Sequence, residues 1–182
     1  MNADFEQLLR IMYDPSSYTH PNHLAETLLS RDIWDEILIN YWIISHYQLE
    51  DLPDRWSARD MMTSLILDNW LLLPQAAHFA GSYLLRNQLM KQSALLATDA
   101  KLLAFISLPL VYQVSLTMAA EEITPAKCGA DFIKSMVTGL PVALQQRIML
   151  SFPSTEKETK CIASPTPDNI NLFKMSLAYA YN

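Results

Sequence analysis

WLLLPQAAHFAGSYLLRNQLMKQSALL, residues 70–96, is the stretch around which the chain is organised. Pro74 lacks an N–H and has a φ close to the helical value, so we predict that a helix begins there. At about 100° per residue, one line along this helix is apolar and the opposite line is polar. The apolar line holds Leu73, Ala77, Ala80 and Leu84, and the polar line holds Gln75, His78, Ser82 and Arg86.

Small residues gather in the first half of the same helix, at Ala76, Ala77, Ala80 and Gly81. Side chains this small allow a second helix to approach toward the short end of the usual spacing of roughly 8–10 Å. We therefore predict that this stretch forms the central packing helix of the fold.

The composition favours an all-α fold. Of the 182 residues, 51% are hydrophobic and 18% are charged, against about 25% charged in an average domain. Only three glycines occur, and strictly alternating runs of β-branched residues are missing. We predict one compact multi-helix domain over residues 1–182, built from roughly eight to ten short helices. Residues 151–167 mix proline, charge and hydroxyl groups, which indicates a mobile loop.

Apolar spacing and capping residues place the helices before the central one. Residues 4–13 form a predicted amphipathic helix that ends at Asp14-Pro15, followed by a turn over residues 13–21 with two tyrosine anchors. Asp32 is the predicted cap of a helix over residues 33–49. That helix is apolar on nearly all sides, so we expect it to be central or covered by a partner. Ser57 and Asp60 have capping-box spacing and predict a helix that runs to residue 70.

Caps and prolines also place the helices after the central one. The predicted helices are residues 99–108 after the cap Thr98, residues 109–122 beginning at Pro109, residues 125–138 between Thr124 and Gly139, the helix beginning at Pro141, and residues 169–181 after the cap Asp168.

Charge and hydropathy exclude several classes of protein. The net charge of -6 and the lack of Lys/Arg clusters argue against binding to nucleic acid or to an anionic membrane surface. Residues 102–120 carry no charge, but Pro109 favours two buried helices over direct membrane insertion. The acidic start MNADFEQLLR does not resemble a secretory leader, so we expect a cytoplasmic protein.

No motif for catalysis, metal binding or cofactor binding is visible, so we expect no enzyme and no cofactor. Cys128 and Cys161 lie outside any CxxC or Cys/His ligand spacing. His20 and His23 flank a proline turn that would aim their rings apart, and a ring nitrogen bonded to the backbone is the favoured interpretation over a metal pair. An enzyme with an unrecognised site would depend only on scattered His, Cys and carboxylate groups.

Three stretches together resemble one family. Residues 9–24, LRIMYDPSSYTHPNHL, are similar in their Asp-Pro, Tyr and His-Pro spacing to the type III secretion accessory proteins of the SctK family, which includes OrgA, MxiK and YscK. Residues 70–96 keep that family's order of Trp, Leu-Pro-Gln, Gly and Leu-Arg, and residues 140–153, LPVALQQRIMLSFP, resemble a third family stretch. The chain departs from the pattern at Ser93, where the family has Gly, and in a shorter C-terminal part.

The resemblance implies a helical, non-enzymatic component of the cytoplasmic sorting platform, at the cytoplasmic face of the injectisome base. Such a protein links the cytoplasmic domain of the inner-membrane ring protein SctD to the pod protein SctQ, and through SctQ to the stalk protein SctL and the ATPase SctN. It thereby supports secretion of effector proteins. The alternative is a cytoplasmic chaperone for type III secreted proteins, because such chaperones are also acidic, although they are usually mixed α/β dimers.

Five residues are candidate partner-binding positions. Four lie in the proline-rich turn after the first predicted helix, and one lies on the polar line of the central helix. They are Tyr13, Asp14, Tyr18, His20 and Arg86. For the turn, a packed structural corner is favoured over a contact surface, because its anchors are aromatic and prolines fix its shape.

Overall fold

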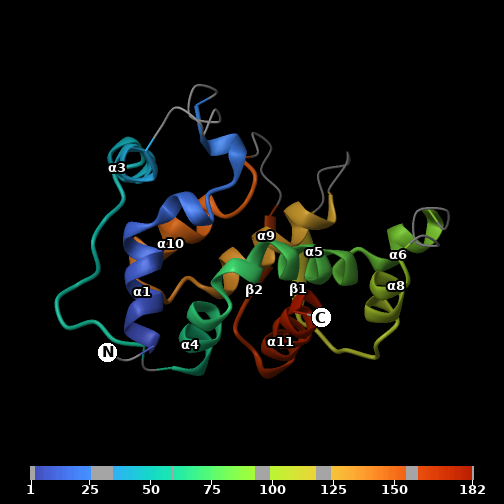
Figure 1. Cartoon of the computed structure of the whole chain (residues 1–182). Helices are drawn as coiled ribbons and strands as arrows, with labels where there is room; N and C mark the ends of the chain where they lie inside the picture. The colour runs from blue at the N-terminus through green and yellow to red at the C-terminus, as the bar shows by residue number, and fades with distance from the viewer. Residues whose placement is uncertain are drawn as a thin grey trace. The chain divides into compact units, whose positions relative to one another are not determined.

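The computed structural model describes residues 3–25, 35–58, 60–92, 99–117, 124–154 and 160–181 (Figure 1). These residues are mainly helical, which confirms the predicted fold class, but they also contain a two-stranded sheet that the sequence did not predict.

The chain divides into two compact units, each with buried residues of its own. Unit 1 comprises residues 1–71 and 139–156, and unit 2 comprises residues 72–138 and 157–182. The single domain over residues 1–182 stays a prediction.

Unit 2 is centred on the predicted packing helix, α5 (Leu73–Leu84), which packs most extensively against α9 (Pro125–Met136). The two backbones meet at two glycines. A Cβ placed on Gly81 would overlap the Pro125 carbonyl oxygen, and one placed on Gly129 would overlap the Ala77 carbonyl. The close approach predicted from the small residues of α5 is therefore confirmed.

The central helix is shorter than predicted. It ends at Leu84, and α6 (Arg86–Leu89) and the 3-10 turn η4 (Met90–Gln92) follow a break at Leu85, while residues 93–98 lie outside the described part of the chain. Ser82, predicted on the polar line, is fully buried. Its hydroxyl donates to the His78 carbonyl 2.7 Å away, so its polar group is satisfied within the helix.

Aromatic rings connect α5 to its neighbours in unit 2, α8 (Ala100–Ile106) and α11 (Pro167–Tyr181). Phe79 packs edge to face against Phe105, with ring centroids 5.3 Å apart, and Tyr179 contacts both rings. The buried Tyr83 hydroxyl donates to the Leu108 carbonyl at 2.6 Å and accepts from the Leu110 N–H at 2.8 Å. These bonds hold the segment after α8 against α5.

The helix predicted over residues 109–122 is wrong. Residues beyond Pro109 are extended and form β1 (Val114–Thr117), which pairs antiparallel with β2 (Lys160–Ala163), while residues 118–123 lie outside the described part. The buried Asn169 side chain holds the residue before β1, since it accepts from the Gln113 N–H at 2.9 Å and donates to the Gln113 carbonyl at 2.8 Å. Tertiary contacts thus override the local signal of the proline.

Within the predicted mobile loop at 151–167, residues 160–163 belong to β2, and residues 155–159 lie outside the described part. Its mobility stays a prediction. The strand alternates, with Cys161 and Ala163 buried and Ile162 exposed, as expected when one face packs on α9.

Unit 1 contains α1 (Ala3–Tyr13), α3 (Glu36–His46), α4 (Met61–Asp68) and α10 (Val142–Leu150). The helix α1 contacts both α4 and α10. Between α1 and α10 lies the Arg147 side chain, which is 1% exposed. Its guanidinium donates to the carbonyls of Met12 at 3.0 Å, Glu50 at 2.7 Å and Ala143 at 2.9 Å. A buried cation is therefore held by backbone oxygens, and one of them, that of Met12, lies at the C-terminal end of α1, where the helix dipole favours positive charge.

The predicted apolar helix at 33–49 is observed as α3, with Asp35 as its cap instead of Asp32, which lies outside the described residues. Asp35 accepts from the Ile37 N–H at 3.0 Å. Ile39 and Ile43 pack with Leu150 in a buried cluster. The other side of α3 is open, and its exposed apolar residues are Ile37, Leu38 and Tyr41.

Other helix starts also differ from prediction by a few residues. Asp60, not Ser57, caps α4 and accepts from the Thr63 N–H at 2.9 Å. Asp99 caps α8, and Thr98 lies outside the described part. The final helix begins at Pro167 instead of after Asp168. Thr124 caps α9 as predicted, but α9 ends at Met136, before Gly139.

None of the described helices is long and apolar enough to cross a membrane. In the uncharged stretch 102–120, the described residues form α8 and β1 and the chain between them.

We predict that Gly81→Ala destabilises the protein by about 2–3 kcal/mol. Alanine gains about 1 kcal/mol in helix propensity, but its Cβ forces the backbones of α5 and α9 apart, and overpacking of this kind outweighs that gain. Urea unfolding followed by circular dichroism measures the change. Gly139→Ala is the matched control, because no atom lies within 4 Å of its Cβ position. Equal stability of the two variants would contradict the tight crossing.

We predict that Arg147→Met lowers the free energy of unfolding by about 3–5 kcal/mol, because the Met12 and Glu50 carbonyls lose their charged donor. The same urea titration measures this change. Arg10→Met, at an exposed position of α1, should change stability by less than about 0.5 kcal/mol. A similar midpoint for both variants would show that Arg147 does not hold unit 1 together.

Candidate interaction site

The turn that follows α1 contains four of the five candidate residues. Pro15 begins the 3-10 turn η1 (Pro15–Ser17), and Pro21 begins η2 (Pro21–His23). The Asp14 carboxylate accepts from the Ser16 hydroxyl at 3.1 Å and from the Asn40 side chain of α3 at 3.0 Å. Asn40 in turn accepts from the Ser16 N–H at 2.8 Å. Asp14 thus fastens the turn to α3.

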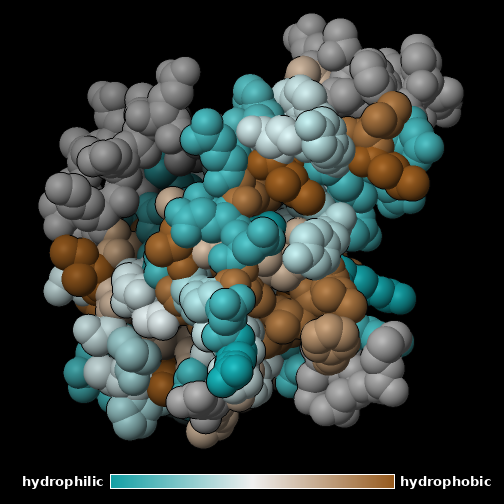
Figure 2. Space-filling model, turned by 90° about the vertical axis from the view of Figure 1, so that its left-hand side faces the viewer, coloured by the Kyte–Doolittle hydropathy of each residue, from teal (hydrophilic) through white to brown (hydrophobic). Residues whose placement is uncertain are grey.

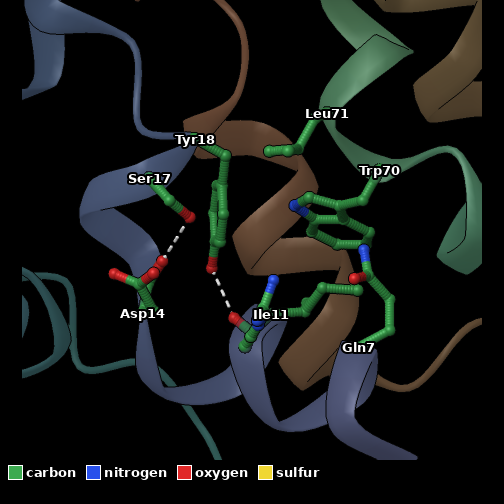
Figure 3. Close-up of a pocket in the computed structure, with 8 residues that line it drawn as sticks. Gln7, Ile11, Asp14, Ser17, Tyr18, Trp70 and Leu71 are labelled. Carbon is green, nitrogen blue, oxygen red and sulfur yellow. Dashed lines mark hydrogen bonds between the residues drawn. The ribbon is translucent and has the colours of Figure 1, made fainter. Parts of the chain in front are cut away.

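Tyr18 anchors the turn from inside unit 1. Its hydroxyl donates to the Ile11 carbonyl at 2.6 Å, and its ring meets Trp70 edge to face, with centroids 5.5 Å apart (Figure 3). Burial raises the pKa of the Tyr18 hydroxyl well above its ordinary value, and the positive charge of Arg147 opposes this rise. Tyr18 is therefore a neutral packing residue, which agrees with a structural corner.

His20 and His23 join the turn to the end of α10. The His20 N–H donates to the Leu150 carbonyl at 2.8 Å, and the His23 ring Nε2 lies 2.7 Å from the Phe152 carbonyl oxygen. The His20 ring Nδ1 accepts from the Asn22 N–H at 3.2 Å. The predicted bonds between ring nitrogens and backbone are confirmed. In the part of the chain that the structure describes, no group of three or more His, Cys, Asp or Glu residues is placed to hold a metal ion.

Burial also changes the protonation of His20. Its pKa is lowered, first by burial and then by the neighbouring His23, so the neutral ring is favoured in the folded state. A neutral Nδ1 is what the bond from the Asn22 N–H requires, because a protonated ring has no acceptor. Charge at this corner therefore comes from residues other than His20 near neutral pH.

A pocket of about 140 Å³ opens beside Tyr18 in unit 1. Figure 3 shows Tyr18 and Trp70 side by side among the lining residues, with Gln7 and Ile11 of α1 below and Leu71 above. Its remaining lining residues are Arg10, Asp14 and Ser17. The pocket combines a buried aromatic wall with a polar rim.

Trp70 carries an unusual feature at this pocket. Its side chain is 1% exposed, yet the indole Nε1–H has no acceptor among the described residues. Leaving a buried donor unpaired costs about 1–3 kcal/mol. Figure 3 shows this nitrogen on the edge of the indole that faces Tyr18 and Leu71. The fold therefore keeps an unsatisfied donor at the wall of the pocket.

The candidate residues differ in exposure. Tyr13 is 57% exposed, whereas Tyr18 is 9% exposed and Asp14 and His20 are half-buried.

Arg86 belongs to unit 2, where its guanidinium carbon lies 4.5 Å from the ring centroid of Tyr83 and 5.5 Å from that of Tyr112. The structure thus brings Tyr13, Asp14, Tyr18 and His20 together at one corner and leaves Arg86 as a separate position.

Sequence reasoning did not name Trp70, Asn40 or Arg147 as part of this corner. Trp70 is the first residue of the stretch that resembles the family, and this position could have indicated that Trp70 has a functional role. Arg147 lies between Leu144 and Ile148 on a mainly apolar helix, and a lone charge in that setting indicates a buried role. No pattern in the sequence around Asn40 indicates its bonds to Asp14 and Ser16.

Hydrophobic side chains reach the surface among hydrophilic ones on the face shown in Figure 2. The exposed large apolar residues of unit 1 include Tyr13, Ile37, Leu38, Tyr41 and Leu71. Exposed aromatic and aliphatic side chains of this kind are typical of protein-binding surfaces when they gather in patches.

The two cysteines lie together in unit 2. Cys128 of α9 and Cys161 of β2 are both buried, and their thiols share a hydrogen bond. That bond, together with burial, raises the pKa of Cys161. A buried thiol with a raised pKa is a poor nucleophile, so Cys161 has the character of a packing residue.

Comparison with known proteins gives a consistent result. Residues 8–182 match the family described as bacterial type III secretion apparatus protein (OrgA_MxiK). The oxygen-regulated invasion protein OrgA from Salmonella typhimurium strains SL1344 and LT2 is 28% identical over 151 residues, which cover 79% of this chain and 73% of that protein. No solved structure matches. Because the family match covers nearly the whole sequence, the chain belongs to the OrgA/MxiK family of bacterial type III secretion apparatus proteins.

Proposed function

We propose that this protein is a non-enzymatic adaptor of the type III secretion sorting platform. In this proposal it joins the cytoplasmic domain of an SctD-like ring protein to an SctQ-like pod protein, and through the latter to SctL and the SctN ATPase. Its place would be the cytoplasmic face of the injectisome base. Membership of the apparatus family over residues 8–182 is the observation that carries the proposal.

The surface of unit 1 supports a binding role. Tyr13 projects into solvent from a turn whose backbone is fixed by Asp14, Tyr18 and His20. A rigid exposed aromatic side chain loses little conformational entropy when it is buried by a partner. We assign Tyr13 to direct contact, with Asp14 and His20 at its edge and Tyr18 as the positioning residue.

Arg86 is the second proposed contact, in unit 2. Its guanidinium stacks on two tyrosine rings, and one of its terminal nitrogens is buried with no hydrogen-bond acceptor among the described residues. A carboxylate from a partner would supply that acceptor.

The mainly helical fold favours the adaptor over the chaperone alternative, since secretion chaperones of the kind considered are mixed α/β proteins. The only described strands are the four-residue β1 and β2.

Co-purification tests the adaptor proposal. We expect the tagged chain to retain the pod protein and the ring protein's cytoplasmic domain from the same secretion system, each co-expressed separately. Capture of SctL by the pod protein under the same conditions is the positive control. Retention of neither expected neighbour while that control succeeds would refute the proposal.

Substitutions at the two tyrosines separate contact from positioning. Tyr13→Ala should leave the free energy of unfolding within about 0.5 kcal/mol of the original and weaken partner binding about tenfold or more, because an exposed anchor is lost. Tyr18→Phe removes only the bond to the Ile11 carbonyl and should cost about 0.5–1.5 kcal/mol of stability, with affinity retained. Urea unfolding and calorimetric titration measure the two quantities.

Tyr181→Ala is the control for loss of an exposed tyrosine, since that residue is 80% exposed at the end of α11. We expect its affinity to match that of the original chain. Full affinity in the Tyr13→Ala variant would remove Tyr13 from the binding surface.

A further inference from the structure

We propose that the pocket beside Trp70 binds one large apolar side chain from a partner protein, and that the partner's adjacent backbone carbonyl accepts a hydrogen bond from the Trp70 indole N–H. The inference rests on the proposed adaptor function and adds to it a specific contact site and the chemistry of the partner segment.

The size and walls of the pocket suit a single side chain. Its volume is about 140 Å³, close to that of cavities of about 150 Å³ that hold one benzene ring. Ile11, Tyr18 and Trp70 are buried and provide an apolar floor, while Leu71 is 63% exposed at the mouth. An aromatic or large aliphatic side chain would fill this space and cover Leu71.

The unpaired donor indicates a polar atom beside that side chain. Trp70 Nε1 lies within the pocket wall, shielded from solvent and without an acceptor among the described residues. Because the nitrogen is shielded, binding requires Leu71, which is 63% exposed at the mouth, to move aside and then pack against the inserted side chain. A backbone carbonyl next to the inserted side chain is an acceptor that every peptide segment carries, so binding would satisfy the donor that folding leaves unpaired.

The rim of the pocket adds a charge preference. Arg10 is exposed at the rim and forms no ion pair within the described ranges. The Asp14 carboxylate on the same rim is already bonded to Ser16 and Asn40. The free positive charge therefore favours a partner segment with Asp or Glu near its apolar residue.

Blocking the mouth of the pocket tests the proposal. Ser17 lies at the exposed rim, where its hydroxyl donates to the Asp14 carbonyl at 2.7 Å, so Ser17→Ala removes that bond alone, whereas Ser17→Trp also fills the opening. We expect the affinity of Ser17→Trp for whichever neighbour the original chain retains, the pod protein or the ring protein domain, to fall at least tenfold in calorimetric titration. Ser57→Trp is the matched control, because it places the same side chain at a different pocket of unit 1 and should keep full affinity.

The indole N–H gives a second, independent readout. The chain has four tryptophans, so ¹⁵N labelling gives at most four indole signals, and Trp70→Phe identifies the one from Trp70. On addition of the partner, the Trp70 indole proton should move downfield as it gains an acceptor. Arg10→Glu should also weaken binding more than Arg10→Lys does.

The outcomes separate this inference from the adaptor proposal. If the original chain binds a neighbour but Ser17→Trp binds equally well, or the Trp70 indole signal stays in place, the pocket is not the contact site and the adaptor proposal still stands. If the original chain binds neither neighbour, both proposals fall. Selective loss in Ser17→Trp together with a shifted Trp70 signal supports the pocket.

Discussion

The buried guanidinium of Arg147 holds together three segments of unit 1 that are far apart in the sequence. It binds the last turn of α1 through Met12, the chain after α3 through Glu50, and its own helix through Ala143. Because the Met12 carbonyl lies immediately before Tyr13, the position of the whole corner depends on this cation. The Tyr18 hydroxyl bonds the neighbouring Ile11 carbonyl, so the Tyr18 ring and the pocket wall that it forms with Trp70 are attached to the same helix end. A contact residue such as Tyr13 can bind more tightly from a rigid backbone, because less conformational entropy is lost when the partner binds.

The two units use opposite solutions to bring helices together. In unit 2 the contact between α5 and α9 depends on the absence of side chains at Gly81 and Gly129, and the run of small residues around Gly81 predicted the close approach, although not the part played by Gly129. In unit 1 the contact depends on a long charged side chain that reaches three carbonyls. Its partners come from distant segments, so no local pattern in the sequence could name them. The spacing of hydrophobic residues indicates which face of a helix is apolar, but it does not indicate which backbone oxygens a buried cation will bind.

The same distinction explains which features of the corner and the fold could be predicted. The turn after α1 follows from Pro15, Pro21 and the tyrosine anchors, all within a few residues, and Thr124 was correctly identified as a cap. The helix expected after Pro109 does not form, because residues 114–117 pair with β2, more than forty positions away, and because Asn169 bonds both backbone groups of Gln113. The pocket was not predicted, since Trp70 and Tyr18 are far apart in the sequence and α4, which precedes Trp70, packs on α1 through contacts that no local pattern specifies.

The order of the units along the chain has a consequence for synthesis on the ribosome. Unit 1 is interrupted by residues 72–138, so its first part emerges long before α10 does. Arg147 follows Met12 by 135 residues. At translation rates of roughly 5–20 residues per second, the Met12 carbonyl waits about 7–27 seconds for its donor. During that interval the Met12 and Glu50 carbonyls lack their charged donor, so we expect the aromatic corner to reach its final form only after α10 has been synthesised.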